Sequence, residues 1–329
     1  MAGGKKLLNA ITDVPGIRVG HASDLEAKTG CTVILCEEGA VAGVDVRGTA
    51  AGTRQIDSLN PLHLVNEVHA VCLAGGSAFG LDAGGGVVKF LEEQGKGLDI
   101  LTVRIPIVPT AIIFDIFFGD NKVRPDKEMG YQACLNCSSE KVDEGSVGVG
   151  TGATVGKLFT TKQAMKGGVG TASARLPNGA VVGALAVVNA FGDVIDGKGE
   201  IIVGARAAED SGELVNSAER IKDGGVQREF LPGESTTLGV IATNCRLSKE
   251  QATKIAQMAQ DGIARATDPA HSLFDGDVTF ALSLGNKDAD VNTIGRWGAE
   301  LIAESIQRAV READGFGIVP AYRDLKKGK

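Results

Sequence analysis

The segment Gly233-Glu234-Ser235-Thr236-Thr237-Leu238-Gly239-Val240-Ile241-Ala242-Thr243-Asn244 joins a charged, turn-rich region to an apolar run with the composition of a strand. Two threonines stand at the join, and their β-branched side chains are by themselves typical of a strand start. A threonine there is a poor nucleophile unless the chain is cut before it. Its new α-amino group would then lie beside its own hydroxyl, titrate near neutrality and act as a base. The segment therefore supports either a plain strand start or a nucleophile at Thr236.

Size and charge limit what the chain can be. With 329 residues it can bury a large core, and 46 glycines with only 4% aromatic residues favour tight turns and close backbone packing. A net charge of −7 without any Lys/Arg run argues against a nucleic-acid partner. We expect no secretory signal at the N-terminus and no membrane span, because no stretch reaches the roughly 18 apolar residues that a span requires.

The six cysteines are scattered and several lie in apolar runs, as is typical of a reducing cytoplasm, where we expect the protein to be located. One CxxC pair, Cys134 and Cys137, has no second pair or histidine nearby, so we predict no metal site. No cofactor is expected either. The loop 148–153 fits a dinucleotide pattern formally, but neither the helix nor the acidic residue of that motif follows. The loop 75–80 could hold an anion or be a close strand-to-helix turn.

Apolar runs alternate with amphipathic segments along the chain, which predicts an α/β fold. Ala180 to Asn189 is almost wholly apolar, as in a strand buried on both faces. Residues 31–37 and 40–46 suggest a hairpin that turns at Glu38-Gly39. A capping box at Ser248 opens a helix that extends to about Thr267. Other strands are predicted over 11–20, 70–74, 280–284 and the start of 201–220, and helices over 81–94, 125–139, the rest of 201–220 and 290–313; 223–234 is predicted to be an exposed loop.

Two groups of polar residues end apolar runs. Asn189 ends the strand that starts at Ala180, where a side-chain amide could donate to an oxyanion or simply form a turn. Asp275-Gly276-Asp277 precedes the strand near Phe280, and its two carboxylates could orient an amine and move a proton, or form an Asp-Gly turn. The histidines show no ligand spacing, and no GxSxG nucleophile elbow is present.

Taken together, these motifs resemble a family of self-processing N-terminal-nucleophile hydrolases. The family contains the L-aminopeptidase/D-esterases, the β-aminopeptidases and the nylon-oligomer (6-aminohexanoate-oligomer) endohydrolases, and the resemblance runs over nearly the whole chain. The threonine and the Asp-Gly-Asp pair are more similar to the nylon-oligomer branch than to the serine aminopeptidases. The matching stretches are 11–21 (ITDVPGIRVGH), 73–82 (LAGGSAFGLD), 150–157 (GTGATVGK), 166–171 (KGGVGT), 236–244 (TTLGVIATN) and 275–277 (DGD).

The resemblance implies a role for each matching position. Thr236 would be the nucleophile, exposed by self-cleavage of the Ser235–Thr236 bond. Asp275 and Asp277 would hold its amine, and Asn189 would face the scissile carbonyl. A lysine is expected near the site, with Lys157 the best match by spacing and Lys166 the alternative. The chain departs from the branch at Ser235, where asparagine is usual, so the rate of self-cleavage is open.

The implied fold is one α/β domain over 1–329, with two central sheets between helical layers. Cleavage would divide it into 1–235 and 236–329, and the pairs would assemble as a tetramer. The implied activity is hydrolysis of amide bonds in small linear substrates such as short peptides, amino-acid amides or 6-aminohexanoate oligomers. Alternatives are an aminopeptidase/esterase that requires a free substrate N-terminus, a non-catalytic ligand-binding relative, and acyl transfer as in the ornithine acetyltransferases.

Overall fold

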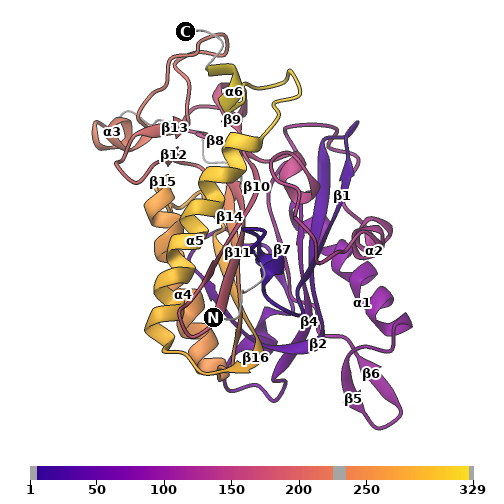
Figure 1. Ribbon diagram of the computed structural model, residues 1–329. Helices are drawn as coiled ribbons and strands as arrows, with labels where there is room; N and C mark the ends of the chain where they lie inside the picture. The colour runs from indigo at the N-terminus through magenta and orange to yellow at the C-terminus, as the bar shows by residue number, and fades with distance from the viewer. Residues whose placement is uncertain (1–5, 225–234, 326–329) are drawn as a thin grey trace.

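The computed structural model of the protein describes residues 6–224 and 235–325. Its centre is a nine-stranded sheet in the order β10-β11-β14-β16-β2-β4-β7-β3, with β1 paired to β2. Figure 1 shows helices α4 and α5 on one flank of the molecule and α1 and α2 on the opposite flank. The strands of this sheet are β1 (Arg18–Asp24), β2 (Thr29–Val46), β3 (Thr53–Arg54), β4 (Glu67–Ala74), β7 (Thr110–Ile112), β10 (Gly168–Arg175), β11 (Val181–Asn189), β14 (Thr236–Cys245) and β16 (Val278–Lys287).

Short strands and helices complete the domain. The helices are α1 (Ala83–Glu93), α2 (Lys127–Leu135), α3 (Ser217–Lys222), α4 (Lys249–Ala266), α5 (Val291–Glu312) and α6 (Tyr322–Leu325). The remaining strands form three small sheets: β12 (Asp193–Ile195) with β13 (Ile201–Val203) and β15 (Thr267–Asp268); β5 (Leu98–Ile100) with β6 (Val103–Ile105); and β8 (Thr154–Val155) with β9 (Met165–Lys166).

Successive side chains of the buried strands point to opposite faces of the sheet, which explains how the helices and strands are layered. In β14, Leu238 and Val240 point into an inner core shared with β2 and β4, whereas Ile241 points into the core beneath α4 and α5. The opposite faces of β2 and β4 form a third core with α1 and α2. Burial on both faces requires continuous apolar runs of the kind that the sequence shows. The predicted layering of helix, two β layers and helix is confirmed, and the two β layers are hydrogen-bonded into one sheet through β2.

The hairpin predicted around Glu38-Gly39 is wrong. Residues Thr29–Val46 form one long strand, and the pairing of β2 with β4 shifts register between Leu35 and Ala40. Gly39 has φ +92°, a backbone conformation open to glycine, so the chain bulges there without reversing. The first part of β2 pairs with β1 and β4, while its second part pairs with β16.

Most other elements agree with the sequence, with shorter bounds in several places. The strands predicted at 70–74, 180–189 and 280–284 and the helices at 248–267 and 290–313 are confirmed. The strand predicted over 11–20 begins only at Arg18, after a 3-10 turn at Ile11–Asp13. Region 201–220 holds a three-residue strand and a short helix separated by a loop. The predicted loop at 223–234 lies, after its first two residues, outside the described residues.

Candidate active site

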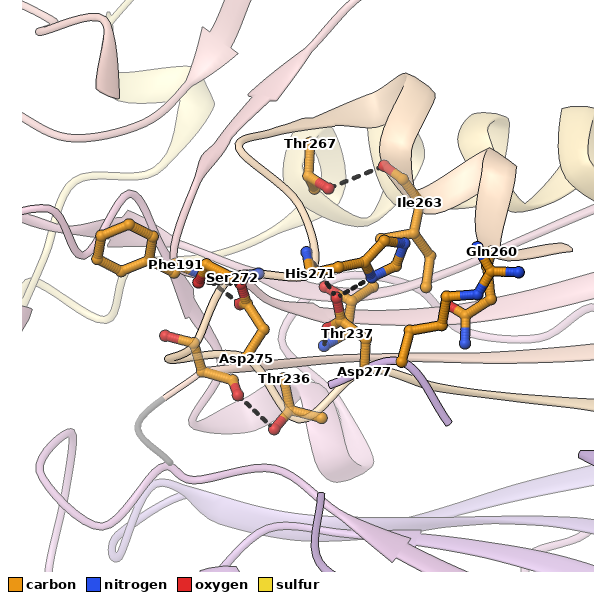
Figure 2. A network of polar contacts seen from close by, with 12 residues as sticks. Phe191, Thr236, Thr237, Gln260, Ile263, Thr267, His271, Ser272, Asp275 and Asp277 are labelled. Carbon is orange, nitrogen blue, oxygen red and sulfur yellow. Dashed lines mark hydrogen bonds and ion pairs between the residues drawn. The ribbon is translucent and has the colours of Figure 1, made fainter. Parts of the chain in front are cut away.

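Thr236 is the first residue of β14 and is buried, directly opposite Asn189 of β11 in the antiparallel register. Its Oγ1 donates a hydrogen bond to the carbonyl oxygen of Ser235 at 2.6 Å. The backbone N–H of Gly276 donates to the same oxygen at 2.8 Å. Figure 2 shows the Thr236 hydroxyl turned toward this carbonyl. The Thr236 hydroxyl and a backbone donor therefore meet at the carbonyl of the peptide bond between Ser235 and Thr236.

The segment before β16 creates this geometry by backbone pairing. Ser235 forms a parallel bridge with Asp275, which brings the Gly276 N–H to the Ser235 carbonyl. A Cβ atom at Gly276 would lie 2.8 Å from Thr236 Oγ1 and 2.7 Å from the carbonyl oxygen of Ala50. Only glycine fits without displacing the hydroxyl, which explains the middle residue of Asp275-Gly276-Asp277 in structural terms.

The two aspartates are buried and have different partners. Asp275 Oδ1 accepts the N–H of Phe191 at 3.1 Å, and its Oδ2 accepts the N–H of Ser272 at 2.9 Å and the Ser272 hydroxyl at 2.5 Å. Asp277 Oδ1 accepts the N–H of Thr237, the residue after Thr236, at 2.6 Å. Burial and then the charge of Asp277 raise the pKa of Asp275 to about 6, although its hydrogen bonds oppose the shift. Asp275 thus fixes the loop, and Asp277 lies against the residue after Thr236.

Lys157, rather than Lys166, lies beside Asn189. Lys157 Nζ donates to the Asn189 side-chain oxygen at 2.8 Å and to its backbone oxygen at 2.9 Å. The Asn189 side-chain oxygen also accepts the N–H of Thr154 at 3.0 Å, and its amide nitrogen donates to the Phe114 carbonyl at 3.1 Å. The buried Lys157 side chain is thereby held next to the strand position that faces Thr236.

Lys166 is fully buried and donates to the backbone carbonyls of Gly150, Ala153 and Gly167. Burial lowers its pKa to about 7, against the opposing charge of Asp115. These bonds join the glycine-rich loop at 148–153 to β9 and to Gly167, which follows it, so the structure gives that loop a structural partner. Among the described residues, no group of three or more histidine, cysteine, aspartate or glutamate side chains is arranged to hold a metal ion.

Two neighbours of the aspartates were not singled out from the sequence. Ser272 binds Asp275 as described above, and His271 Nδ1 lies 2.7 Å from Asp277 Oδ2 (Figure 2). Both residues lie in the short connection between β15 and β16, within six positions of Asp277. Closeness in sequence to the Asp-Gly-Asp motif was the available signal, but the side-chain directions depend on how that connection folds.

Residues 9–319 match the family model of Peptidase family S58. The chain belongs to peptidase family S58. An uncharacterized aminopeptidase of Mycobacterium tuberculosis is 39% identical over 98% of this chain and 99% of its own length. A 6-aminohexanoate-oligomer endohydrolase of Paenarthrobacter ureafaciens is 30% identical over 84% of this chain and 75% of its own length. Membership and these relatives identify this S58 protein as a hydrolase of the amidohydrolase/aminopeptidase kind, in agreement with the resemblance seen in the sequence.

Solved structures show the same fold for the S58 chain. The L-aminopeptidase D-Ala-esterase/amidase of Ochrobactrum anthropi, described as a variant of the Ntn hydrolase fold, superposes with a TM-score of 0.70 at 20% identity. That match covers 95% of this chain and 89% of the other. A β-aminopeptidase of Burkholderia sp. gives a TM-score of 0.67 at 22% identity, over 100% and 96% of the two chains. Among the described residues, no helix combines the length and apolar character needed to cross a membrane.

Proposed function

We propose that this S58 protein is a self-cleaving amidohydrolase whose nucleophile is Thr236 and whose subunits are residues 1–235 and 236–329. The observation that carries the proposal is the contact of Thr236 Oγ1 with the Ser235 carbonyl, together with the Gly276 N–H on the same oxygen. The hydroxyl is within reach of the peptide group that it would attack. The backbone donor lies where negative charge would develop on the carbonyl oxygen.

Self-cleavage follows as an acyl shift from nitrogen to oxygen. Thr236 Oγ1 attacks the carbonyl carbon of Ser235, and the hydroxyl proton passes to the departing peptide nitrogen. The C–N bond breaks and leaves Ser235 esterified to the threonine oxygen. Water then hydrolyses the ester, which gives a carboxylate at Ser235 and a free α-amine at Thr236.

The mature enzyme repeats this chemistry on a substrate amide. The Thr236 amine takes the proton of its own hydroxyl, the oxygen attacks the substrate carbonyl, and the leaving amine receives that proton. Asn189 stabilises the oxyanion, Lys157 orients Asn189 through the bonds at 2.8 and 2.9 Å, and Asp277 and Asp275 hold the segment around the amine. Water then hydrolyses the acyl ester.

We propose small linear amides as substrates: short peptides, amino-acid amides or 6-aminohexanoate oligomers. The 6-aminohexanoate-oligomer endohydrolases of Paenarthrobacter ureafaciens and Kocuria sp., 30% and 32% identical over 84% of this chain, support this class. The names of the aminopeptidase relatives support a second candidate, an aminopeptidase/esterase that requires a free substrate N-terminus. Comparing hydrolysis of a free and an N-acetylated oligomer separates the two.

We further propose a tetramer of subunit pairs in the cytoplasm. The six cysteines are all free and buried in the structure, which suits a reducing compartment. Light scattering of the purified protein tests the tetramer.

The test of the proposed function is a denaturing gel of the purified protein. We expect two bands, and N-terminal sequencing of the smaller fragment should give Thr-Thr-Leu-Gly. A single band of 33.9 kDa would contradict self-cleavage, and a fragment with another start would contradict the assignment of Thr236.

Replacement of Ser235 should change the rate of maturation. The Ser235 hydroxyl is buried and has no hydrogen-bond partner among the described residues, so the side chain does nothing to orient the bond that is cut. An asparagine offers both a donor and an acceptor there. We expect Ser235→Asn to shorten the half-time of cleavage in a time course on gels, with Ser211→Asn on the surface as the matched control. Unchanged or slower cleavage would contradict this prediction.

The raised pKa of Asp275 predicts a specific dependence of stability on pH. In the folded chain Asp275 keeps its proton up to about pH 6, whereas an unfolded aspartate releases it near pH 4. Between these values the folded state binds more protons, so this group makes the free energy of unfolding fall as the pH rises. In an uncut chain carrying Thr236→Ala, adding Asp275→Asn should remove about 1–3 kcal/mol of that fall.

Urea denaturation at pH 4, 5, 6 and 7 measures the effect as a difference between the two chains. Asp193, whose pKa burial also raises to about 6, is present in both and cancels. Identical pH profiles for the two chains would show that Asp275 is already ionised in the folded protein at pH 4.

A further inference from the structure

His271 is tied to the carboxylate that lies beside the nucleophile. Its Nδ1 is 2.7 Å from Asp277 Oδ2, and its backbone N–H donates to the same oxygen at 3.3 Å. The other oxygen of Asp277 accepts the N–H of Thr237. One carboxylate therefore connects His271 to the residue that follows Thr236, and Figure 2 shows the imidazole on the side of Asp277 that faces Gln260 and Ile263 of α4.

The surroundings of the ring favour its protonated form. The groups that face it are Asp277, the backbone of Gln260, to which it hydrogen-bonds, and the more distant Arg47 after β2. Burial lowers the pKa of His271 and Arg47 acts in the same direction. The hydrogen bond and charge of Asp277 and the bond to Gln260 oppose them, and the net direction is upward. The imidazole is 19% exposed, so its charge is only partly screened by water.

We propose that His271 is a positioning residue whose positive charge holds Asp277 in place and offsets the two buried carboxylates, so that the Thr236 amine can act as a base near neutral pH. This inference rests on the proposed function, in which the amine freed at Thr236 accepts the hydroxyl proton. Asp275 and Asp277 alone favour the ammonium form of that amine, which cannot accept a proton. An imidazolium bound to Asp277 counters that effect.

The inference fixes the direction in which the pH dependence of kcat/KM moves. The acidic limb of that profile reports deprotonation of the amine in the free enzyme. Removing the positive charge raises the pKa of the ammonium, so His271→Gln should move the limb to higher pH by on the order of one unit. Removing the negative charge with Asp277→Asn should move it to lower pH. If His271 served only in packing, His271→Gln would not shift the limb.

The experiment uses the cleaved enzyme and a chromogenic amide. His271→Gln keeps a hydrogen-bond donor for Asp277 without the charge, and His271→Lys keeps the charge without the ring. We expect the acidic limb of the kcat/KM profile to move to higher pH in His271→Gln and to stay within a few tenths of a pH unit of the wild type in His271→Lys. The exposed control His63→Gln should leave the limb where it is. A limb that does not move in His271→Gln, or that moves equally in the Lys variant, overturns the inference.

A gel and N-terminal sequencing accompany each pH profile, so failure of the proposed function can be distinguished from failure of the inference about His271. Wild-type protein that is not cut before Thr236 refutes the proposed function, whatever the histidine does. Should His271→Gln not mature, the imidazole is titrated directly by NMR in the uncut Thr236→Ala chain. We expect its pKa to lie above 6.5 and to fall on Asp277→Asn. A value at or below 6.5, or one that Asp277→Asn leaves unchanged, overturns the inference.

Discussion

Thr236→Ala is expected to yield one uncut chain of 33.9 kDa without measurable amidase activity. The substitution removes Thr236 Oγ1, which contacts the Ser235 carbonyl oxygen at 2.6 Å. Without cleavage the amine stays in a peptide bond and cannot act as a base, so nucleophile and base are lost together. Loss of such a unit costs on the order of 10⁶ in turnover, which is below detection for a slow amidase.

Two controls make this result specific. Thr237→Ala removes the neighbouring buried hydroxyl but keeps the Thr237 N–H that binds Asp277, so cleavage should continue. Thr236→Ser keeps a hydroxyl and, after cleavage, an amine, so it should mature and retain activity. Cleavage of Thr236→Ala at the same bond would contradict the assignment of Thr236 as the nucleophile. So would a folded Thr237→Ala chain that is not cleaved at all.

Asn189→Ala in cleaved enzyme should lower kcat by about 10²–10³, the usual loss for one oxyanion donor. The substitution also removes an acceptor of Lys157 Nζ, and the two side chains are in direct contact at 2.8 Å. We therefore expect Lys157→Met to produce a similar loss, and the double variant to be little worse than either, because the pair acts as a unit. The acidic limb of the pH profile should stay in place for Asn189→Ala.

The measurement is kcat on a chromogenic amide for the two single variants and the double variant. Asn178→Ala, an exposed asparagine whose side chain binds the Asp288 carbonyl, is the matched control and should keep wild-type kcat. Fully additive losses would show that Lys157 does not act through Asn189. An unchanged kcat in Asn189→Ala would leave the oxyanion without its proposed donor.

The sequence predicted the parts of the fold that depend on local patterns. The apolar runs of β11 and β14, the capping box at Ser248 and the long helix α5 were identified because each carries its own periodicity or cap. The path of β2 was not identified from the sequence, because a glycine at position 39 is compatible with either a turn or a bulge. The choice between them depends on β16, which pairs with the second half of the strand and lies far along the chain.

The site shows the same division. Thr236, Asn189, Asp275 and Asp277 end or begin apolar runs, and such positions can be recognised from the sequence. Their contacts could not be predicted, because they depend on pairing between distant strands: Asn189 meets Thr236 only through the β11–β14 register. By spacing, Lys157 was the better match and Lys166 the alternative, and only the fold places Lys157 Nζ at Asn189 and Lys166 Nζ among backbone carbonyls.

The position of β14 and β16 in the sheet bears on how the protein is made. These two strands, which follow the proposed cut before Thr236, lie between β11 and β2, which precede it. An uncut chain can fold by itself, in a reaction whose rate does not depend on concentration. Once cut, the pieces would share the inner core and the core beneath α4 and α5. They would have to find each other to refold, so the rate would become second order in protein. Cleavage before Thr236 would therefore follow folding, and the mature enzyme would keep the structure that the precursor formed. After dilution from denaturant, the cut protein would refold more slowly than the uncut chain.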